Sequence, residues 1–423
     1  MTLMPSVRSL AALPLGLCLL AAQTSSQAVD FSTSGFGTVG YAVSDQPYYY
    51  QRFIDDKGTF KRDTVLGAQV DAKLSAEWSA TVQAKVAPSL HNDDDWSLSA
   101  SWAFISWRPG NDWLLRLGKQ RVPMYLNSEN MDVGQTYDFA RLPFEMYGLS
   151  PSNDFKGISV SRNWLPDIGE VTLDAFHGEA DISARAYGRD RGAVFMPVCT
   201  TITGSVLTLK KDTSTWRLGL HHTVTRRRDG ESFPSHFPYV DAGGYYRVDN
   251  AMFGTEPVGT TSSIVNDVIT LGADMELAPD WRLVSEFARN IQKRTENGAN
   301  TAGGYIAVLR KLGGFTPYVS YARLRSMGVS VRMADALNTA QSPFFPADLN
   351  YSQRAASDAI MVYDQDTVAL GTSYALTAQS KLKAEWARTR IGNRSATVDS
   401  PAGDDVIRRQ RINVLSLNYS FVF

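Results

Sequence analysis

The chain has 423 residues, a formal net charge of −1, two cysteines and five histidines. A charge this close to zero gives no sign of the basic surface that nucleic acids attract, and the scarcity of cysteine excludes a fold held together by disulfides. Glycine and aromatic residues are plentiful, which is typical of an all-β chain with many turns.

The first 28 residues have the pattern of a secretory signal peptide that is removed. Arg8 precedes the apolar stretch SLAALPLGLCLLAA, and Ser26 and Ala28 satisfy the small-residue rule for cleavage after Ala28. A membrane anchor is the alternative, but the apolar stretch of about 14 residues is shorter than the roughly 20 that a spanning helix needs. We therefore expect residues 29–423 to form a single domain in which Cys199 is the one remaining cysteine.

Apolar and polar residues alternate in sixteen segments of this domain, and each alternation predicts a strand with one apolar and one polar face. The segments are 31–43, 64–74, 78–87, 96–107, 113–122, 156–164, 169–179, 201–211, 215–225, 263–277, 281–291, 302–311, 315–325, 366–376, 381–391 and 411–423.

The connections between these segments alternate between two classes. Short connections such as RPGND and TAQS are rich in Pro, Gly, Asp, Asn and Ser and predict tight turns. The long connections cover roughly 45–61, 88–95, 122–155, 179–200, 226–262, 292–301, 326–365 and 392–410. An even number of strands with all short turns at one end predicts an all-β fold, a sixteen-stranded antiparallel transmembrane β-barrel with short periplasmic turns and long extracellular loops.

The two faces of the predicted strands match the two environments of such a barrel. Leu66, Val82, Trp102 and Phe104 are among the residues expected to face lipid. The opposite faces carry too many charges for a packed core, which predicts a water-filled interior. Aromatic residues next to the short turns predict a girdle at the membrane surface, unless they are ordinary strand aromatics; they are Trp78, Trp107, Trp113, Trp164, Trp216, Trp281 and Phe315.

Two stretches resemble Gram-negative bacterial porins of the sixteen-stranded superfamily, in a less-characterised proteobacterial branch. One is LRLGKQRVP (115–123) with the long segment after it, and the other is the terminal strand with Tyr419, Phe421 and Phe423. The resemblance implies that loop 122–155 folds inward and narrows the pore, that the protein is a homotrimer, and that the terminal aromatics are the signal for the outer-membrane assembly machinery. The loop lacks the PEFGG-like stretch of the best-known porins, so pore size and ion preference do not carry over.

The inward-folded loop and the wall that faces it supply opposite charges. The acidic loop residues are Glu129, Asp132, Asp138 and Glu145, and the basic residues expected on the wall are Lys85, Arg116, Lys210, Arg217, Arg310 and Lys383. Acid facing base would create a transverse field that favours polar solutes over apolar ones. The alternatives are a solvated loop with scattered charges, or charges that pair with one another.

A second basic group has the alternation of the lipid face near the long loops: Arg388, Arg390, Arg409 and Arg411. Charge is costly at the middle of the membrane but nearly free at its surface, and arginine binds phosphate in two-point fashion. One hypothesis is a rim that binds lipopolysaccharide. A strand that has left the membrane or a bulge that reverses the alternation is the simpler explanation, and a contact between protomers is a third.

No motif of a hydrolase, metalloprotease or nucleotide-binding enzyme occurs, so we expect no enzyme, cofactor or metal. The acidic stretch Asn92–Asp95 has Ca²⁺-binding residue types, but it lacks a glycine turn and a distal Glu, which favours a solvated tip. The sequence therefore predicts an outer-membrane porin for passive diffusion of small polar solutes and ions. A channel selective for sugars, peptides or anions is one alternative. The other is an adhesin or receptor that binds partners through loops such as 241–254.

Overall fold

The computed structural model describes residues 29–148, 154–236, 239–241, 246–248, 259–296, 298, 300–327, 329–339, 347–403 and 406–423. The expected signal peptide lies outside these residues, as does most of loop 241–254. Within them, sixteen strands form one closed barrel in chain order, and its first strand pairs antiparallel with its last. The predicted fold class is confirmed.

The barrel strands are β1 (Asp30–Ser44), β2 (Val65–Lys73), β3 (Trp78–Pro88), β4 (Trp96–Gly110), β5 (Trp113–Arg121), β6 (Asp154–Trp164), β7 (Glu170–Gly188), β8 (Gly192–Lys211), β9 (Ser214–Arg227), β14 (Ile264–Ala278), β15 (Trp281–Lys293), β16 (Thr301–Arg310), β17 (Phe315–Ser326), β18 (Asp364–Thr377), β19 (Ser380–Ile391) and β20 (Arg411–Val422). The connections contain the short strands β10 (Phe233–His236), β11 (Tyr239–Asp241), β12 (Tyr246–Val248) and β13 (Gly259–Thr261), the 3₁₀ helix η1 (Gly134–Thr136), and the helices α1 (Phe144–Tyr147), α2 (Val329–Thr339) and α3 (Ala347–Ala359).

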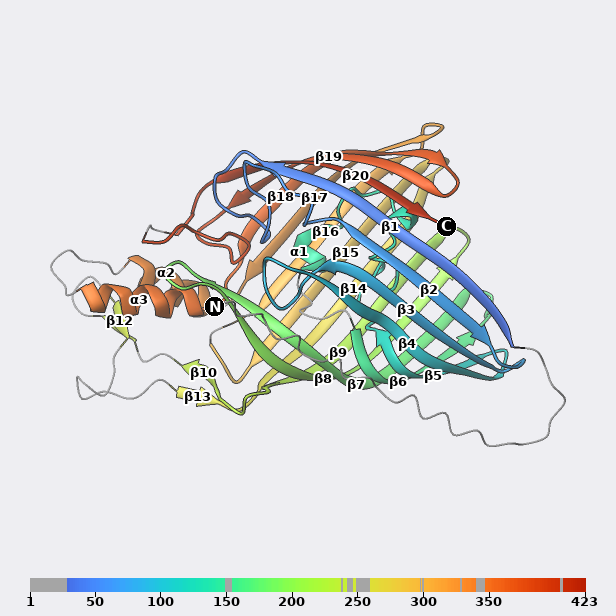
Figure 1. Ribbon diagram of the computed structural model, residues 1–423, viewed down its shortest axis with the longest axis horizontal. Helices are drawn as coiled ribbons and strands as arrows, with labels where there is room; N and C mark the ends of the chain where they lie inside the picture. Colours follow the sequence, from blue (N-terminus) through green and yellow to red (C-terminus); the bar gives the residue numbers. More distant parts are fainter. Residues whose placement is uncertain are drawn as a thin grey trace, which may run out of the picture.

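The two ends of the barrel differ as the connection lengths predict. Figure 1 shows α2, α3 and the paired strands β10 and β13 beyond one end of the barrel, while the C-terminus lies at the other. No helix in the described ranges is long and apolar enough to cross a membrane.

Large apolar side chains cover the outside of the barrel, as the alternation predicts. Leu98 is 75% exposed and Leu117 is 67% exposed, although both lie within strands. At the short-turn end, Trp78 stacks on Trp107 with ring centroids 5.8 Å apart, and Phe315 lies 4.4 Å from Tyr374. These half-exposed rings match the expected girdle.

A bulge in β4 changes the predicted faces of two aromatic residues. The register between β3 and β4 shifts at Gln83, so Ala84 pairs with Ala100 and Gln83 pairs with Trp102. The extra residue reverses the alternation, and Ile105 rather than Phe104 is exposed on the outer face. The predicted lipid-facing positions of Trp102 and Phe104 are therefore wrong.

The segment 179–200, expected as a loop, forms the upper halves of β7 and β8. These strands pair as far as Gly188 and Gly192, and only a tight turn joins them. Their alternation continues with reversed polarity, since Glu179 and Asp181 are exposed while Ala180 and Ile182 are buried. A hairpin that continues beyond the membrane meets water on its outer face, which accounts for the change.

The seam between β1 and β20 is closed by glycines and aromatic rings. The Gly35 amide donates to the Phe423 carbonyl at 2.8 Å, and the Phe423 amide donates back at 3.0 Å. A Cβ atom at Gly35 would lie 2.1 Å from the Phe423 ring, and one at Gly37 would lie 2.6 Å from the Phe421 ring. The terminal rings therefore lie flat on backbone that has no side chains of its own.

The interior is polar only in part, which corrects the expectation of a wholly water-filled lumen. Residues 122–148, hereafter the inner loop, fold into the barrel and pack apolar side chains such as Phe139 and Met146 against the wall. The wall contributes inward-facing residues that include Val284, Leu309 and Tyr318. The loop thus fills one side of the lumen and leaves space on the other.

Candidate functional site

The inner loop begins where the wall between β4 and β5 ends. Their pairing stops at Ala103 and Lys119, and Pro123 cannot extend the strand ladder because it lacks an amide hydrogen. The loop then crosses the lumen. The Leu126 amide donates to Glu286 on β15 at 2.8 Å, and the Ala140 carbonyl accepts from Asn418 on β20 at 2.6 Å.

Two of the four predicted acidic residues hold the inner loop to basic side chains. Asp132 accepts from Lys85 on β3 at 2.7 Å and from Arg121 at 2.6 Å. Asp138 accepts from Lys381 on β19 at 2.9 Å. These contacts join the loop to the wall at β3 and β5 and at β19, on either side of the seam between β1 and β20.

The other two acidic residues lie in different surroundings. The Glu129 side chain is 55% exposed, and its carboxylate lies 3.8 Å from the Arg116 guanidinium. Glu145 is only 2% exposed and accepts from Gln365 at 2.7 Å and from Thr367 at 2.5 Å. Because Glu145 is enclosed between loop and wall, the expectation that it faces the pore is wrong.

Two predicted wall residues bind the backbone of the inner loop. Arg217 donates to the Tyr125 carbonyl at 2.8 Å, and Lys383 donates to the Phe139 carbonyl at 3.0 Å. The Lys383 ammonium also lies 4.1 Å from the centroid of the Tyr137 ring. Both cations therefore position the loop by charge-assisted hydrogen bonds.

Arg310 lies outside the barrel, which contradicts its predicted place on the pore wall. It is paired in register with Trp281 on the outer face, and its guanidinium lies 4.9 Å from the centroid of that ring. Ala307 and Leu309 are the inward residues of this strand end. Because both faces of YIAVLR are apolar, the sequence alone does not reveal which residues face inward.

A buried ion pair joins two loops and was not predicted from the sequence. Arg141 donates to both carboxylate oxygens of Asp63, at 2.8 and 2.5 Å, and also to Ser416 at 3.1 Å. Asp63 belongs to the connection between β1 and β2, so the pair joins two loops to β20. Arg141 is one charge among several on the loop, and no signal in the sequence indicates its partner.

Glu286 on β15 was also missed. It accepts from Tyr147 at 2.6 Å and from Tyr305 at 2.9 Å, in addition to the Leu126 amide. All of these side chains are buried. A single acidic residue at an inward strand position was a weak signal, because the partners on the loop cannot be inferred from spacing.

Two carboxyl groups on the loops have lowered pKa values. Burial by itself raises the pKa of Asp132, but Lys85 and Arg121 outweigh this effect and hold the pKa well below its usual range. Burial likewise opposes ionisation of Asp63, and the Arg141 guanidinium reverses the effect so that the pKa of Asp63 is lowered. Both groups are therefore ionised at neutral pH and remain so in mild acid.

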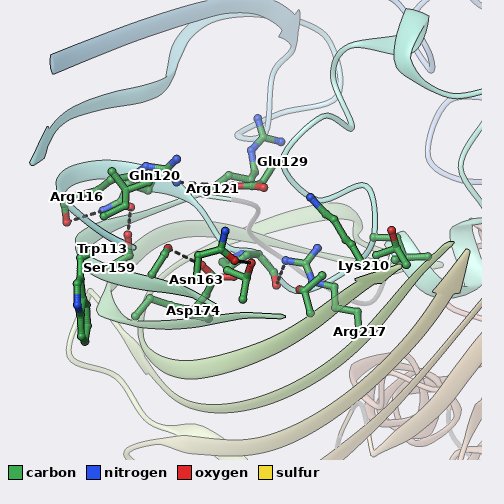
Figure 2. A pocket seen from close by; sticks show the side chains of 18 of the residues that line it. Trp113, Arg116, Gln120, Arg121, Glu129, Ser159, Asn163, Asp174, Lys210 and Arg217 are labelled. Atoms are coloured by element: carbon green, nitrogen blue, oxygen red, sulfur yellow. Dashed lines mark hydrogen bonds and ion pairs between the residues drawn. The ribbon is translucent and has the colours of Figure 1, made fainter. Parts of the chain in front are cut away.

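A polar cavity of about 460 Å³ extends from the short-turn end to the inner loop. Asn111 and Asp112 line it at the β4–β5 turn, and Leu126 and Glu129 line it where it meets the loop. Figure 2 shows Arg116 on one side of this cavity and Lys210 and Arg217 on the other. We call this space the lower cavity.

A second cavity of about 330 Å³, the upper cavity, lies on the long-loop side of the inner loop. Met131, Asp132 and Arg141 line it from the loop, and Asp63 lines it from the β1–β2 connection. The two cavities have no lining residue in common. The inner loop between Glu129 and Met131 therefore separates them.

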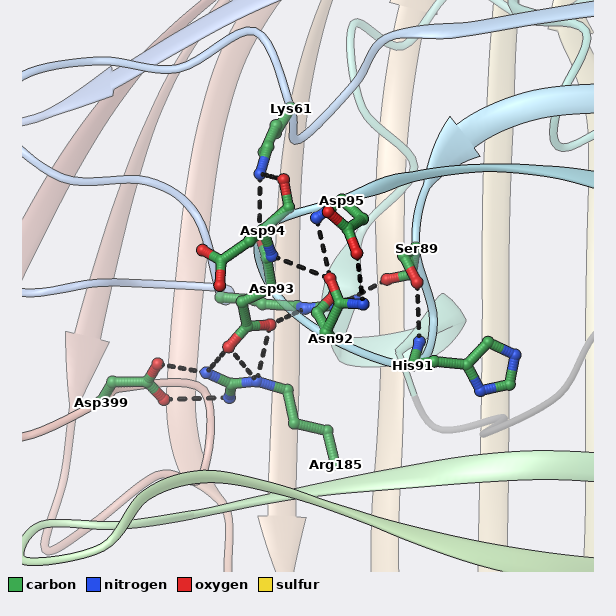
Figure 3. Close-up of polar contacts among 10 residues, drawn as sticks. Lys61, Ser89, His91, Asn92, Asp93, Asp94, Asp95, Arg185 and Asp399 are labelled. Atoms are coloured by element: carbon green, nitrogen blue, oxygen red, sulfur yellow. Dashed lines mark hydrogen bonds and ion pairs between the residues drawn. The ribbon is translucent and has the colours of Figure 1, made fainter. Parts of the chain in front are cut away.

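The acidic stretch Asn92–Asp95 helps to hold the β3–β4 and β19–β20 connections together at the long-loop end. Arg185 bridges Asp93, at 3.0 Å, and Asp399, at 2.5 Å, as Figure 3 shows. The Asn92 side chain caps the turn by accepting from the amides of Asp94 and Asp95. Among the described residues no group of three or more His, Cys, Asp or Glu side chains is placed to hold a metal ion.

Comparison with known proteins identifies solved structures of the same fold. The outer membrane protein OmpT of Vibrio cholerae, in a variant lacking loop L8, matches with a TM-score of 0.52 and 11% identity over 94% of this chain and 100% of its own. The outer membrane channel DcaP of Acinetobacter baumannii matches with a TM-score of 0.52 and 12% identity over 95% and 100%. OmpF of Salmonella typhi matches with a TM-score of 0.51 and 9% identity over 92% and 97%.

No family model and no curated protein matches the sequence. The structural likeness confirms the predicted resemblance to porins at the level of the fold. At these identities the choice of solute has to be argued from the residues of this chain.

Proposed function

We propose that this protein is an outer-membrane channel through which small polar solutes and ions diffuse passively. The observation that carries the proposal is the lower cavity, a polar space of about 460 Å³ inside a closed barrel whose outer surface is apolar. A barrel that satisfies its own backbone hydrogen bonds can cross lipid. The fold it shares with the channel DcaP supports the same conclusion.

The proposed route joins the upper and lower cavities past the inner loop. Glu129 lines the lower cavity and Asp132 lines the upper one. The narrowest part of the route would then lie beside residues 129–132, next to Lys85, Arg116 and Arg121. Acid on the loop and base on the wall would give the passage a transverse field at this point.

Three further parts of the proposal rest on the resemblance to porins. The protein would be a homotrimer, residues 1–28 would be a cleaved signal peptide, and Tyr419, Phe421 and Phe423 would be read by the assembly machinery. The place of Phe421 and Phe423 on the closing seam supports the last of these, because the machinery would meet the seam before the barrel closes.

The route can be tested by blocking it at one residue. In a Cys199→Ser background, Glu129→Cys would place a single reactive thiol at the boundary of the two cavities in the mature protein. We expect a bulky thiol reagent to reduce the single-channel current in planar bilayers by at least half. Leu165→Cys is the matched control, since Leu165 is 82% exposed in the β6–β7 turn and lines neither cavity.

The same recordings separate the competing functions. A large ohmic current that does not saturate supports the general pore, whereas saturation by one solute class indicates a selective channel. Absence of any current from the folded barrel would refute the proposal and favour an adhesin or receptor. A current that the reagent leaves unchanged at Glu129→Cys would refute the proposed route.

A further inference from the structure

Six arginines form one exposed cluster on the outer face of four adjacent strands and the loop before the last of them. The cluster, hereafter the arginine patch, comprises Arg323 and Arg325 on β17, Arg388 and Arg390 on β19, Arg409 in the loop before β20, and Arg411 at the start of β20. All six residues are exposed. Strands β17 to β20 are consecutive neighbours in the barrel, so these side chains share one surface.

The register places the patch on the lipid side of the wall without ambiguity. The row of directly paired residues runs from Arg323 through Asp366 and Arg390 to Arg411. The only irregularity between β18 and β19 lies at the far end, between Ala375 and Thr377. Thr389 and Ile391 are almost fully buried between the exposed arginines. A bulge that reverses the faces, an alternative that the sequence left open, is therefore excluded.

The patch carries far more positive than negative charge. Two acidic residues lie among the arginines, and Asp364 pairs with Arg325 at 3.2 Å. In the part of the chain that the structure describes, the side chains of Arg323, Arg388 and Arg390 have no ion pair or hydrogen bond. The same holds for the side chains of Arg409 and Arg411 within the described ranges. Five guanidinium groups are thus left to bind something outside the chain.

The surface is also hollowed at this place. A groove of about 920 Å³ is lined by Arg323, Arg325, Arg390, Arg409 and Arg411, together with Asp364 and Asp366. With strands about 4.8 Å apart and about 3.4 Å per residue, the patch extends roughly 15 Å across the wall and roughly 14 Å along it, from the level of Arg325 to that of Arg388. These dimensions suit a headgroup with more than one anionic centre better than a single small ion.

The patch borders the apolar belt of the barrel. The next outward row toward the short-turn end contains Tyr321 and Val368, each about two-fifths exposed, in register with Arg388 of the patch. The row after it, with Trp386 and Leu415, is apolar. Arginine would be costly deeper in lipid but is tolerated at the membrane surface. The guanidinium groups therefore lie at the level of the lipid headgroups, if the barrel is embedded as its function requires.

The geometry points to a binding site for the phosphorylated headgroup of a lipid in the leaflet at the long-loop end. Guanidinium forks bind phosphate oxygens in pairs and keep their charge at every physiological pH. The apolar row below the patch would meet the acyl chains of the same lipid. This inference goes beyond solute passage, although it rests on the proposed membrane embedding. Lipopolysaccharide is the probe that matches this chemistry.

The test compares two double variants that each remove two outer-face arginines. Arg388→Ala/Arg390→Ala alters the patch. Arg162→Ala/Arg310→Ala is the control, because these residues lie over Trp113 and Trp281 at the short-turn end. Binding of lipopolysaccharide to the detergent-solubilised barrel is measured by native mass spectrometry and titration. We expect roughly 30-fold weaker binding for the patch variant, from about fivefold per lost charge, and no change for the control.

A folding check, a lysine variant and two alternative ligands complete the test. Heat-dependent mobility on gels verifies that each barrel is folded, and Arg388→Lys/Arg390→Lys should bind with intermediate affinity because lysine lacks the fork. Equal binding of wild type and Arg388→Ala/Arg390→Ala would overturn the proposal, as would equal binding of dephosphorylated lipopolysaccharide. If the patch bound inorganic phosphate but not lipopolysaccharide, the ligand would not be a lipid. A changed oligomeric state with unchanged lipid binding would assign the patch to a contact between protomers. Conductance should be the same in all variants, so a failed channel assay and a failed lipid assay are distinguishable.

Discussion

Replacement of Arg141 by alanine should release the inner loop, because it leaves Asp63 buried without its partner. The Arg141 and Asp63 side chains are only 10% and 8% exposed, and the contact is bidentate. Loss of one member of a buried pair costs about 3 to 5 kcal/mol. We expect the lower end, about 3 kcal/mol, since both residues line the upper cavity and solvent can reach them there.

Hydrogen exchange in detergent micelles measures this loss directly. A change of about 3 kcal/mol corresponds to roughly 100-fold faster exchange in peptides from the inner loop. The double variant Arg141→Ala/Asp63→Asn should exchange more slowly than Arg141→Ala alone, because it contains no orphan carboxylate. Peptides from β7 and β8, which are far from the pair in the barrel order, provide the internal control.

The stability of the docked inner loop should depend on pH with opposite signs in the wild type and in Arg141→Ala. In the wild type the lowered pKa of Asp63 means that the pair stabilises the docked loop above pH of about 4 and loses this contribution as the pH falls through the lowered value. In Arg141→Ala, burial without compensation raises the pKa of Asp63, so acidification to about pH 5 should partly restore docking. Equal exchange rates in Arg141→Ala and Arg141→Ala/Asp63→Asn would refute the stabilising role of the Arg141–Asp63 pair. Destabilisation of the loop by acid in both the wild type and Arg141→Ala would refute it as well.

Two further substitutions test the seam and the lower cavity. Gly35→Val should lower the yield of folded barrel several-fold, measured by heat-dependent mobility on gels, because the new side chain would occupy the place of the Phe423 ring. Gly110→Val is the control and should fold normally, since a Cβ atom there meets nothing within 4 Å. A normal yield of folded Gly35→Val would contradict the proposed packing of the seam. Lys210→Glu should shift the reversal potential in a salt gradient toward cation preference, because Lys210 lines the lower cavity. The neighbouring Lys211→Glu should have no such effect, since alternate strand residues point to opposite faces.

The strands could be predicted from the sequence because lipid imposes a strict pattern on them. An outward residue such as Leu66 or Val82 must be apolar, so the period of two is visible wherever a strand crosses the membrane. The pattern became unreliable where that constraint ends. Above the membrane β7 and β8 continue with polar residues outside, and in β4 one extra residue, Ser101, exchanged the two faces.

The interior was less predictable because each side chain there contacts particular protein groups, whereas every outward side chain meets the same lipid. Lys85 and Asp132 were both identified as pore charges, but their direct contact at 2.7 Å depends on where the loop crosses the lumen. The contacts of Lys383 are with backbone carbonyls, which carry no sequence signal at all. The partner of Arg141 is 78 residues away along the chain.

Several of the charged side chains inside the barrel are already paired, which limits the residues that can set the ion preference. Arg217 and Lys383 are occupied by loop carbonyls, and Lys85 shares Asp132 with Arg121. A group whose charge is satisfied within the protein contributes less field to the passage than a free one at the same distance.

Three of the predicted pore charges face the lower cavity without such a strong contact. Arg116 and Glu129 are 3.8 Å apart, which is a weak pair for side chains this exposed. Lys210 has no ion pair among the described residues, and it lines the same space. Arg108, Asp112 and Asp174 line the same cavity, also without an ion pair among the described residues, so its unpaired positive and negative side chains nearly balance. We expect a weak ion preference that Lys210 shifts toward anions, instead of the strong field that a count of all loop and wall charges would suggest.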